Sequence, residues 1–318
     1  MTKCATWLVF ATLLAGVSGQ DPGQPKPPAA AAAAPLVSSP RHTFFVAGPT
    51  CTGIFDERGE IAFDLQRPGA RDGVVLPNGN VLVAWSDVVL ETTRERKVVF
   101  RYERSADNQE LGTVWRLDSG RTLVSELGKQ PRLLELTADG KVAAVVALQP
   151  DTDNAHMQTR MARPLANGHY LVPHLLAFAV KEYDASGKVL SVLRTDLEEL
   201  GGRKAENWPF TAIRLADGNT LVGLTHGNRV VEFAANGKVA WSVGNDDLPG
   251  RPIVDACGVQ RLPDGNTVIA SYAATDGMKL FEVDKQKKIV WSYSGPHRVH
   301  HFQVLTTDGK PLPWPPLK

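Results

Sequence analysis

The chain has 318 residues, 43% of them hydrophobic and 22% charged, so it holds enough apolar side chains to bury a sizeable core. Its 35 basic residues balance 34 acidic ones, which excludes the one-signed charge of a protein that holds nucleic acid or an anionic membrane. Three cysteines are too few for a disulfide scaffold. These totals exclude classes of protein, but they indicate no reaction.

The first 19 residues have the three parts of a secretory signal peptide. Lys3 supplies an early positive charge, residues 7–15 are an apolar run, and small residues follow at 17–19. The run is well short of the roughly 20 residues that a membrane-spanning helix needs, and an uncleaved anchor is the alternative. We therefore expect a secreted or periplasmic protein without a membrane span after signal cleavage.

Residues 20–40 are rich in proline and alanine, with an unbroken alanine run at 29–34. A stretch of this composition buries no core and is typical of an extended or flexible spacer. We therefore divide the chain into a signal peptide (1–19), a linker (20–40) and a folded domain (41–318).

The folded domain repeats one motif, in which a leucine is followed three residues later by a glycine and then by an apolar run. The motif glycines lie 41 to 50 residues apart and are Gly79, Gly120, Gly168, Gly218, Gly265 and Gly309. A second turn follows downstream, for example at Asn236-Gly237-Lys238. Asn-Gly and Asp-Gly between apolar runs predict hairpins in which both turn residues have positive φ. Four antiparallel strands per repeat predict a blade of an all-β propeller.

The two ends of the domain complete the count of blades. The last copy stops at Gly309-Lys310 after one strand, whereas residues 42–63 match the other three strands, with Gly59 aligned on Gly237. A composite blade made from both ends closes the ring and removes exposed sheet edges. We therefore predict six blades. The proline-rich tail at 311–318 is expected to lie over the surface because proline cannot continue a strand ladder.

The strand ends at Trp241 and Trp291, together with the Asp-Gly-Asn turns, resemble the PQQ-like (quinoprotein-like) propeller repeat. The resemblance covers about residues 41–310 and implies the propeller fold. Quinone-dependent dehydrogenases of that superfamily are much larger, normally have eight blades and carry calcium at the cofactor. Only two units here end in tryptophan, and no quinone-binding pattern is present, so the resemblance does not imply bound PQQ.

Propellers usually bind ligands on the face formed by the loops between blades and between the second and third strands, which is an argument from fold analogy. Six of the eight histidines map to this face. Counting five residues back from each motif leucine places two arginines and a histidine at the channel mouth. Our candidate ligand-binding residues are Arg71, Asp72, His156, Arg160, His174, His226, Asp255, His300 and His301.

Three questions about this face remain open on the sequence alone. The arginines either form a positive funnel for carboxylate, sulfate or phosphate, or they pair with Asp72, Asp87 and Asp255 as structural bridges. Several imidazoles around one axis fit a divalent metal, although their spacing matches no defined metal motif. Cys51 and Cys257 map to adjacent blades and either form a disulfide or stay free.

The leading functional hypothesis is an exported propeller that binds a small-molecule or carbohydrate ligand, or a protein partner, at the channel mouth. The alternative is a lyase, hydrolase or transferase acting on an anionic carbohydrate or other small molecule through a site in which histidines have either acid–base or metal-binding roles. No catalytic residue or metal ligand is assigned, because no Ser–His–Asp pattern or other motif with a fixed mechanism is present. The aromatic stretch at 207–210 fits either a sugar platform or a wedge between two blades.

Overall fold

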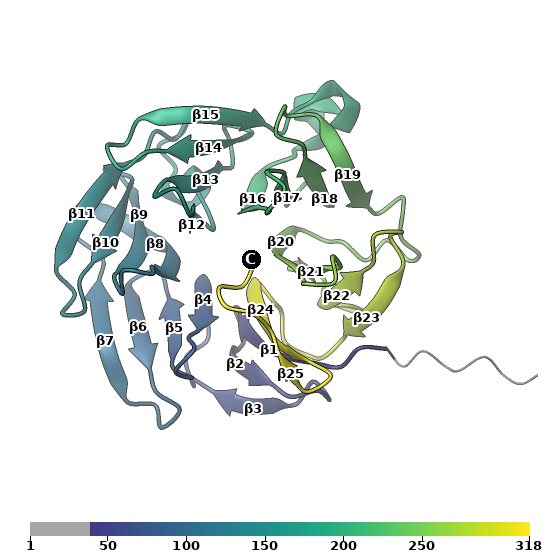
Figure 1. The fold of residues 1–318 in the computed structure, drawn as a ribbon, viewed down its shortest axis with the longest axis horizontal. Coiled ribbons are helices and arrows are strands. Elements are labelled where there is room, and N and C mark those ends of the chain that lie inside the picture. Colours follow the sequence, from purple (N-terminus) through teal and green to yellow (C-terminus); the bar gives the residue numbers. More distant parts are fainter. Residues whose placement is uncertain (1–38) are drawn as a thin grey trace, which may run out of the picture. The chain divides into compact units, whose positions relative to one another are not determined.

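The computed structural model describes residues 39–318. Six antiparallel sheets stand around a common centre in chain order (Figure 1). The predicted six-bladed β-propeller is therefore confirmed. The predicted signal peptide and all of the linker except Ser39 and Pro40 lie outside the described residues.

Each blade is a sheet whose first strand lies nearest the centre and whose last strand lies at the circumference. The composite blade contains β24 (His301–Thr307), β1 (His42–Ala47), β2 (Thr52–Phe55) and β3 (Ile61–Asp64), with β25 (Lys310–Pro311) added at its inner edge. The second blade contains β4 (Asp72–Val75), β5 (Val81–Ala84), β6 (Val88–Thr92) and β7 (Val98–Glu103), and the third β8 (Asn108–Arg116), β9 (Thr122–Gly128), β10 (Arg132–Leu136) and β11 (Val142–Ala147).

The remaining three blades follow the same plan. The fourth contains β12 (Arg163–Pro164), β13 (Tyr170–His174), β14 (Ala179–Tyr183) and β15 (Val189–Arg194), and the fifth β16 (Pro209–Arg214), β17 (Thr220–Leu224), β18 (Arg229–Phe233) and β19 (Val239–Gly244). The sixth contains β20 (Ala256–Arg261), β21 (Thr267–Ser271), β22 (Leu280–Val283) and β23 (Ile289–Tyr293). Three short helical turns lie in the loops: α1 (Ala155–Gln158), η1 (Glu198–Leu200) and η2 (Gly202–Ala205).

The ring closes through the composite blade, as the repeat alignment predicts. Strand β24 from the end of the domain pairs antiparallel with β1 from its beginning, and Val46 lies opposite Phe302. The peptide N–H of His300 extends this ladder by donating to the carbonyl of Ala47 at 3.1 Å. The first and last strands of the domain therefore share one sheet, which is the composite blade.

The inner hairpins have a different turn from the one predicted. The N–H of Gly79 donates to the Leu76 carbonyl at 2.8 Å, and the N–H of Leu76 donates to the Asn80 carbonyl at 2.8 Å. Only Gly79 has positive φ (85°), so the turn is a three-residue loop that ends in a left-handed glycine. The prediction of positive φ at both turn residues is wrong there, and it holds at Asp308-Gly309, where φ is 49° and 73°.

A glutamate in the third strand links each of five blades to the next one. These residues are Glu91, Glu135, Glu182, Glu232 and Glu282. In the fifth blade, Glu232 accepts from the turn residue Asn219 at 2.8 Å and from Arg261 of the next blade at 2.8 Å. The composite blade has Ile54 at the matching position, so this link is missing at its boundary with β4.

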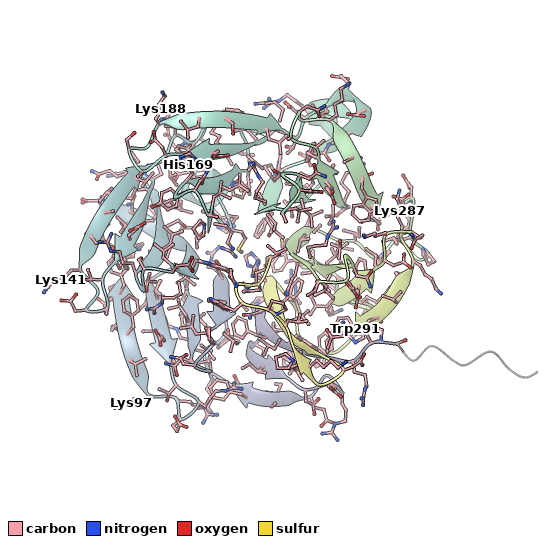
Figure 2. All side chains as sticks on the ribbon, in the orientation of Figure 1. Lys97, Lys141, His169, Lys188, Lys287 and Trp291 are labelled. Carbon is pink, nitrogen blue, oxygen red and sulfur yellow. The ribbon has the colours of Figure 1, made fainter. Side chains whose placement is uncertain are left out.

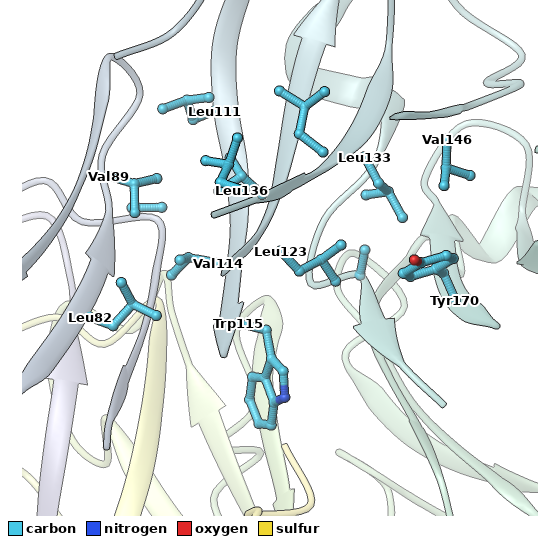
Figure 3. Close-up of a cluster of buried hydrophobic side chains, with 14 of the residues drawn as sticks. Leu82, Val89, Leu111, Val114, Trp115, Leu123, Leu133, Leu136, Val146 and Tyr170 are labelled. Atoms are coloured by element: carbon cyan, nitrogen blue, oxygen red, sulfur yellow. The ribbon is translucent and has the colours of Figure 1, made fainter. Parts of the chain in front are cut away.

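The hydrophobic core lies between neighbouring blades. Figure 3 shows one cluster in which Leu82 and Val89 of the second blade face Leu111 and Val114 of the third. The cluster continues to Tyr170 of the fourth blade. Each sheet therefore buries both faces, and the inner strands stay in fixed positions around the centre.

The outermost strand of each blade is an exposed edge of its sheet, and charged residues lie next to these strands. Lys97, Lys141 and Lys188 directly precede β7, β11 and β15, and Figure 2 shows all three at the circumference of the ring. Lysine at an edge strand disfavours pairing with another chain because its charge would have to be desolvated.

Most of the tail lies over the surface, as predicted, because Pro311, Pro313, Pro315 and Leu317 are exposed, but its last residue, Lys318, is buried. After the turn at Asp308-Gly309, Lys310 and Pro311 pair with β24, and the end of the chain reaches the middle of the ring (Figure 1). A proline is tolerated here because β25 is an edge strand of only two residues. Among residues 39–318, no helix is long and apolar enough to cross a membrane.

Candidate functional site

The face built from the loops between blades, here called the loop face, carries a cavity of about 410 Å³. We call it the loop-face cavity. It is lined by Pro49, Gly69, Ala70, Arg71, His156, Met157, Arg160, Leu175, Trp208, Phe210, Thr225, His226, Asp255, Cys257, Tyr272 and His300. Its volume lies within the range of about 300–1,000 Å³ that is usual for small-molecule sites.

Most of the sequence-predicted residues meet in this cavity. The six that line it are Arg71, His156, Arg160, His226, Asp255 and His300. They come together because each lies at or just before the start of an inner strand or in a loop of the same face. The other three, Asp72, His174 and His301, lie elsewhere and are described below.

His300 is a neutral base held in one orientation. Its Nδ1 lies 2.9 Å from the carbonyl oxygen of Arg71, which only accepts, so Nδ1 carries the proton and Nε2 has a lone pair. Burial lowers the pKa of His300 to about 3, which keeps the ring neutral at pH 7. The edges of the Phe210 and Tyr272 rings flank the imidazole at centroid distances of 5.0 Å.

A carboxylate that the sequence analysis missed lies beside the two arginines. Glu110 lies 3.2 Å from Arg71 Nη2 and 3.3 Å from Arg160 Nη1, and its Oε2 is 3.3 Å from His156 Nδ1. Burial alone would raise the pKa of Glu110, but the hydrogen bond to His156 and the charges of Arg160 and Arg71 outweigh it and lower the pKa. The two arginines are therefore paired with a carboxylate and do not form a free positive funnel. The carboxylate is that of Glu110, and not one of the aspartates that the sequence analysis considered.

The sequence count missed Glu110 because β8 is irregular. Its ladder with β9 shifts register between Asn108 and Glu110 and again between Leu111 and Val114. Each such bulge adds a residue that gapless counting does not see. Counting five residues back from the motif leucine Leu117 gives Gly112, whereas the side chain of Glu110 contacts the site residues.

Arg160 is fully buried and does not lie free at an open funnel. Its guanidinium donates to the carbonyls of Thr159, at 2.7 Å, and His156. Burial lowers the pKa of Arg160 to about 10, and the nearby Glu110 opposes part of this effect. Arg71 is the more accessible arginine of this pair, because 23% of its side chain is exposed.

The rim contains a histidine between aromatic and acidic side chains. The His226 ring stacks on Trp208 with 4.0 Å between centroids. Its Nδ1 lies 3.3 Å from a carboxylate oxygen of Glu206, and its Nε2 lies 4.0 Å from Asp255. Trp208 and Phe210 thus line the cavity, in agreement with a platform as well as a wedge between blades.

His174 has a structural role, which corrects its place among the candidate ligand residues. Its Nδ1 donates to the Gln158 carbonyl at 3.2 Å, and its Nε2 accepts from the Tyr183 hydroxyl at 2.9 Å. The side chain is almost completely buried. A histidine with both nitrogens satisfied inside a blade has no atom left for a ligand.

Asp72 and His301 also face away from the cavity, because their side chains point into the centre of the ring. Asp72 accepts from Nη1 and Nη2 of Arg163 at 2.9 and 3.1 Å, and His301 Nδ1 lies 3.1 Å from Lys318 Nζ. Burial opposes ionisation of Asp72, but the charges of Arg163, Lys318 and His301 keep its pKa below the usual range. These two candidates therefore belong to a buried network around Lys318.

Cys51 and Cys257 are both free and buried, which answers the disulfide question. Cys257 lines the loop-face cavity, whereas Cys51 packs in the core between the composite and sixth blades. Burial raises the pKa of Cys51 to about 11 and raises that of Cys257 further. Neither thiol is ionised at neutral pH.

The histidines do not gather into a metal centre. Within residues 39–318, no three His, Cys, Asp or Glu side chains are close enough together to hold a metal ion. His156, His226 and His300 line one cavity but are held by different partners. The arrangement instead offers one neutral acceptor, one partly exposed guanidinium and several aromatic faces.

Comparison with known proteins supports the fold. No family model and no curated protein matches the sequence. A solved protein of unknown function from Bacteroides caccae has a TM-score of 0.71 and 20% identity, covering 82% of this chain and 98% of that chain. A catalytically inactive histidine-to-alanine variant of virginiamycin B lyase from Staphylococcus aureus, with quinupristin, has a TM-score of 0.56 and 10% identity, covering 81% and 86%.

A streptogramin B lyase is similar to the same extent, with a TM-score of 0.54, 12% identity and coverage of 82% of this chain and 85% of that chain. Identities this low show a shared β-propeller fold and nothing about activity. The similar structures named here do not confirm the PQQ-like repeat, so that resemblance stays a prediction from the motifs.

Proposed function

We propose that this protein binds a small organic molecule in the loop-face cavity and that it does so outside the cytoplasm. The observation that carries the proposal is the convergence of six candidate residues from five blades or their loops on one cavity of about 410 Å³. The signal-peptide pattern of residues 1–19 supports the exported location.

The chemistry of the lining defines the kind of ligand. His300 Nε2 needs a hydroxyl or amide N–H donor from the ligand, and Arg71 offers donors to a carbonyl, hydroxyl or carboxylate oxygen. Trp208 and Tyr272 add flat apolar surface. Because Glu110 already balances charge at the arginines, we expect a polar, ring-containing molecule such as a sugar or a short peptide, and no strict requirement for an anion.

A ligand panel with matched variants tests the proposal. Oligosaccharides, short peptides and aromatic carboxylates are screened by thermal shift, and hits are measured by calorimetry. His300→Gln and Arg71→Gln should each weaken binding about 10-fold, the effect of losing about 1.4 kcal/mol. His169→Gln changes a histidine on the opposite face and should leave affinity unchanged. A hit whose affinity survives both loop-face changes, or a panel without any hit, contradicts the proposal.

A histidine-dependent enzyme is the second candidate, and the contact between His226 and Glu206 favours it. A carboxylate oriented against Nδ1 leaves Nε2 to act as a general base toward a molecule in the cavity. If a substrate is turned over, His226→Gln should lower kcat about 100-fold or more. Unchanged turnover in that variant refutes this candidate, and binding without turnover leaves the first.

A further inference from the structure

The last residues of the sequence bring a lysine to the centre of the ring (Figure 1). The peptide N–H of Arg261 donates to the carbonyl of Leu317 at 2.9 Å. The ring of Trp314 lies nearly parallel to that of Trp115, with 6.0 Å between centroids. These contacts place Lys318 inside the channel, where its side chain has no exposed surface.

The amine of Lys318 meets groups from three inner strands, β4, β8 and β24. Its Nζ donates to the carbonyl of Gly73 at 2.7 Å and lies 3.1 Å from His301 Nδ1. Asp72 Oδ1 lies 3.7 Å away, and the centroid of the Trp115 ring lies 5.6 Å away. A carbonyl, an imidazole nitrogen, a carboxylate and an aromatic face together suit a primary amine.

The ring supplies most of the contacts that hold the Asp72 carboxylate, and the tail adds one to Arg163, whose Nε donates to the Lys318 carbonyl at 2.8 Å. Asp72 accepts two hydrogen bonds from Arg163, one from the peptide N–H of Gly73 at 2.8 Å and one from that of Val114 at 3.0 Å. These donors come from three inner strands, β4, β8 and β12. Because these donors fix the carboxylate from the ring side, we expect the amine-binding groups to keep their positions when the lysine side chain is removed.

We propose that the centre of the ring is a binding site for a primary alkylamine and that residues 312–318 carry Lys318 into it as a tethered ligand. An entry path exists on the hairpin face, the face of the inner hairpin turns. A cavity of about 400 Å³ opens there, and its lining includes Trp115, Arg163, Leu317 and Lys318. A free amine, or the lysine of another polypeptide, reaches the site by this route when the tail leaves it.

Replacement of the lysine side chain by a free amine tests the site. Thermal unfolding is followed for the unchanged chain, Lys318→Ala and Lys318→Met, each with n-butylamine or n-butanol. Lys318→Ala should lower Tm by about 4–8 °C, because buried acceptors lose their donor. n-Butylamine should restore at least half of this loss with a saturable concentration dependence, whereas n-butanol should not. Lys318→Met fills the same space without an amine and should show no saturable gain.

Several results would overturn the proposal. They are an unchanged Tm in Lys318→Ala, a loss that n-butylamine does not restore, and an equal response to n-butylamine in all three proteins. If Lys318→Ala does not fold in buffer alone, the yield of refolded protein with and without n-butylamine replaces Tm. Recovery of folded protein then supports the site, and no recovery refutes it. The outcome is independent of the loop-face cavity, because no residue in the comparison lines it.

Discussion

Acid should destabilise this protein well before its carboxylates titrate, because several histidines are buried as neutral rings. His174 gives the cleanest test, since it lies outside both the loop-face cavity and the Lys318 network. Its Nε2 accepts from the Tyr183 hydroxyl, and that hydroxyl in turn accepts from the peptide N–H of Gln149 at 3.1 Å. Protonation of Nε2 would break the first of these bonds and place a charge in the core.

The size of the effect follows from the pKa of His174. Burial lowers it from 6.5 to about 3, because the charged ring is desolvated and Lys181 lies nearby. In the unfolded chain His174 therefore binds a proton near pH 6.5, whereas in the folded chain it binds one only near pH 3. The free energy of unfolding is highest above pH 6.5 and falls as the pH drops through this window. Between pH 7 and pH 5 the loss from this residue is about 2 kcal/mol.

Urea unfolding at pH 7, 6 and 5 measures this loss. His174→Gln removes the titrating group, so its drop in unfolding free energy between pH 7 and pH 5 should be about 2 kcal/mol smaller than that of the unchanged chain. Val180→Ala, in the strand beside His174, is the matched control. It should cost about 1–3 kcal/mol at every pH and leave the pH dependence unchanged. An equal pH-dependent drop in the unchanged chain and His174→Gln would refute the reasoning.

Two further predictions concern the links between blades and the free thiols. Glu232→Ala should lower the free energy of unfolding by about 2–3 kcal/mol, because the half-buried Arg261 loses its partner. Glu103→Ala removes one member of an exposed ion pair and should cost under about 0.5 kcal/mol. Equal costs of the two variants in urea unfolding would contradict this. Neither Cys51 nor Cys257 should be alkylated by iodoacetamide at pH 8 until urea is added, because burial raises the pKa of both thiols. Peptide mass measures the modification, and rapid alkylation of the folded chain would contradict the prediction by showing that the thiols are accessible.

The fold was predictable because its signals are local and repeated. Each Leu-x-x-Gly unit marks a turn between two apolar strands, and six copies at nearly constant spacing define six sheets. Even the composite blade follows from the way the first and last fragments complement each other. The turn type was wrong at Gly79, because a glycine at one positive-φ position satisfies a three-residue loop as well as a two-residue one.

The site was predictable in position and only partly in content. Loop residues such as His226 and His300 reach the cavity because their place in the repeat fixes the face on which they lie. His174 was misplaced, since the repeat position does not say whether a side chain turns outward or packs into its own blade. Glu110 was missed because bulges in β8 break the count on which the prediction depended.

The sequence by itself determined the architecture, the closure of the ring and the face on which polar loop residues gather, because hairpin turns and strand periodicity act over a few residues. Only the tertiary structure decided which charges meet. Glu110 pairs with Arg71 and Arg160, and Asp72 turns from the predicted ligand face to the centre, where it meets Lys318. Such pairs join residues far apart in the chain, and side-chain direction and burial fix their partners. The repeat therefore sets the strand or loop on which each charged side chain lies, and packing sets which of these side chains become neutral, paired or available to a ligand.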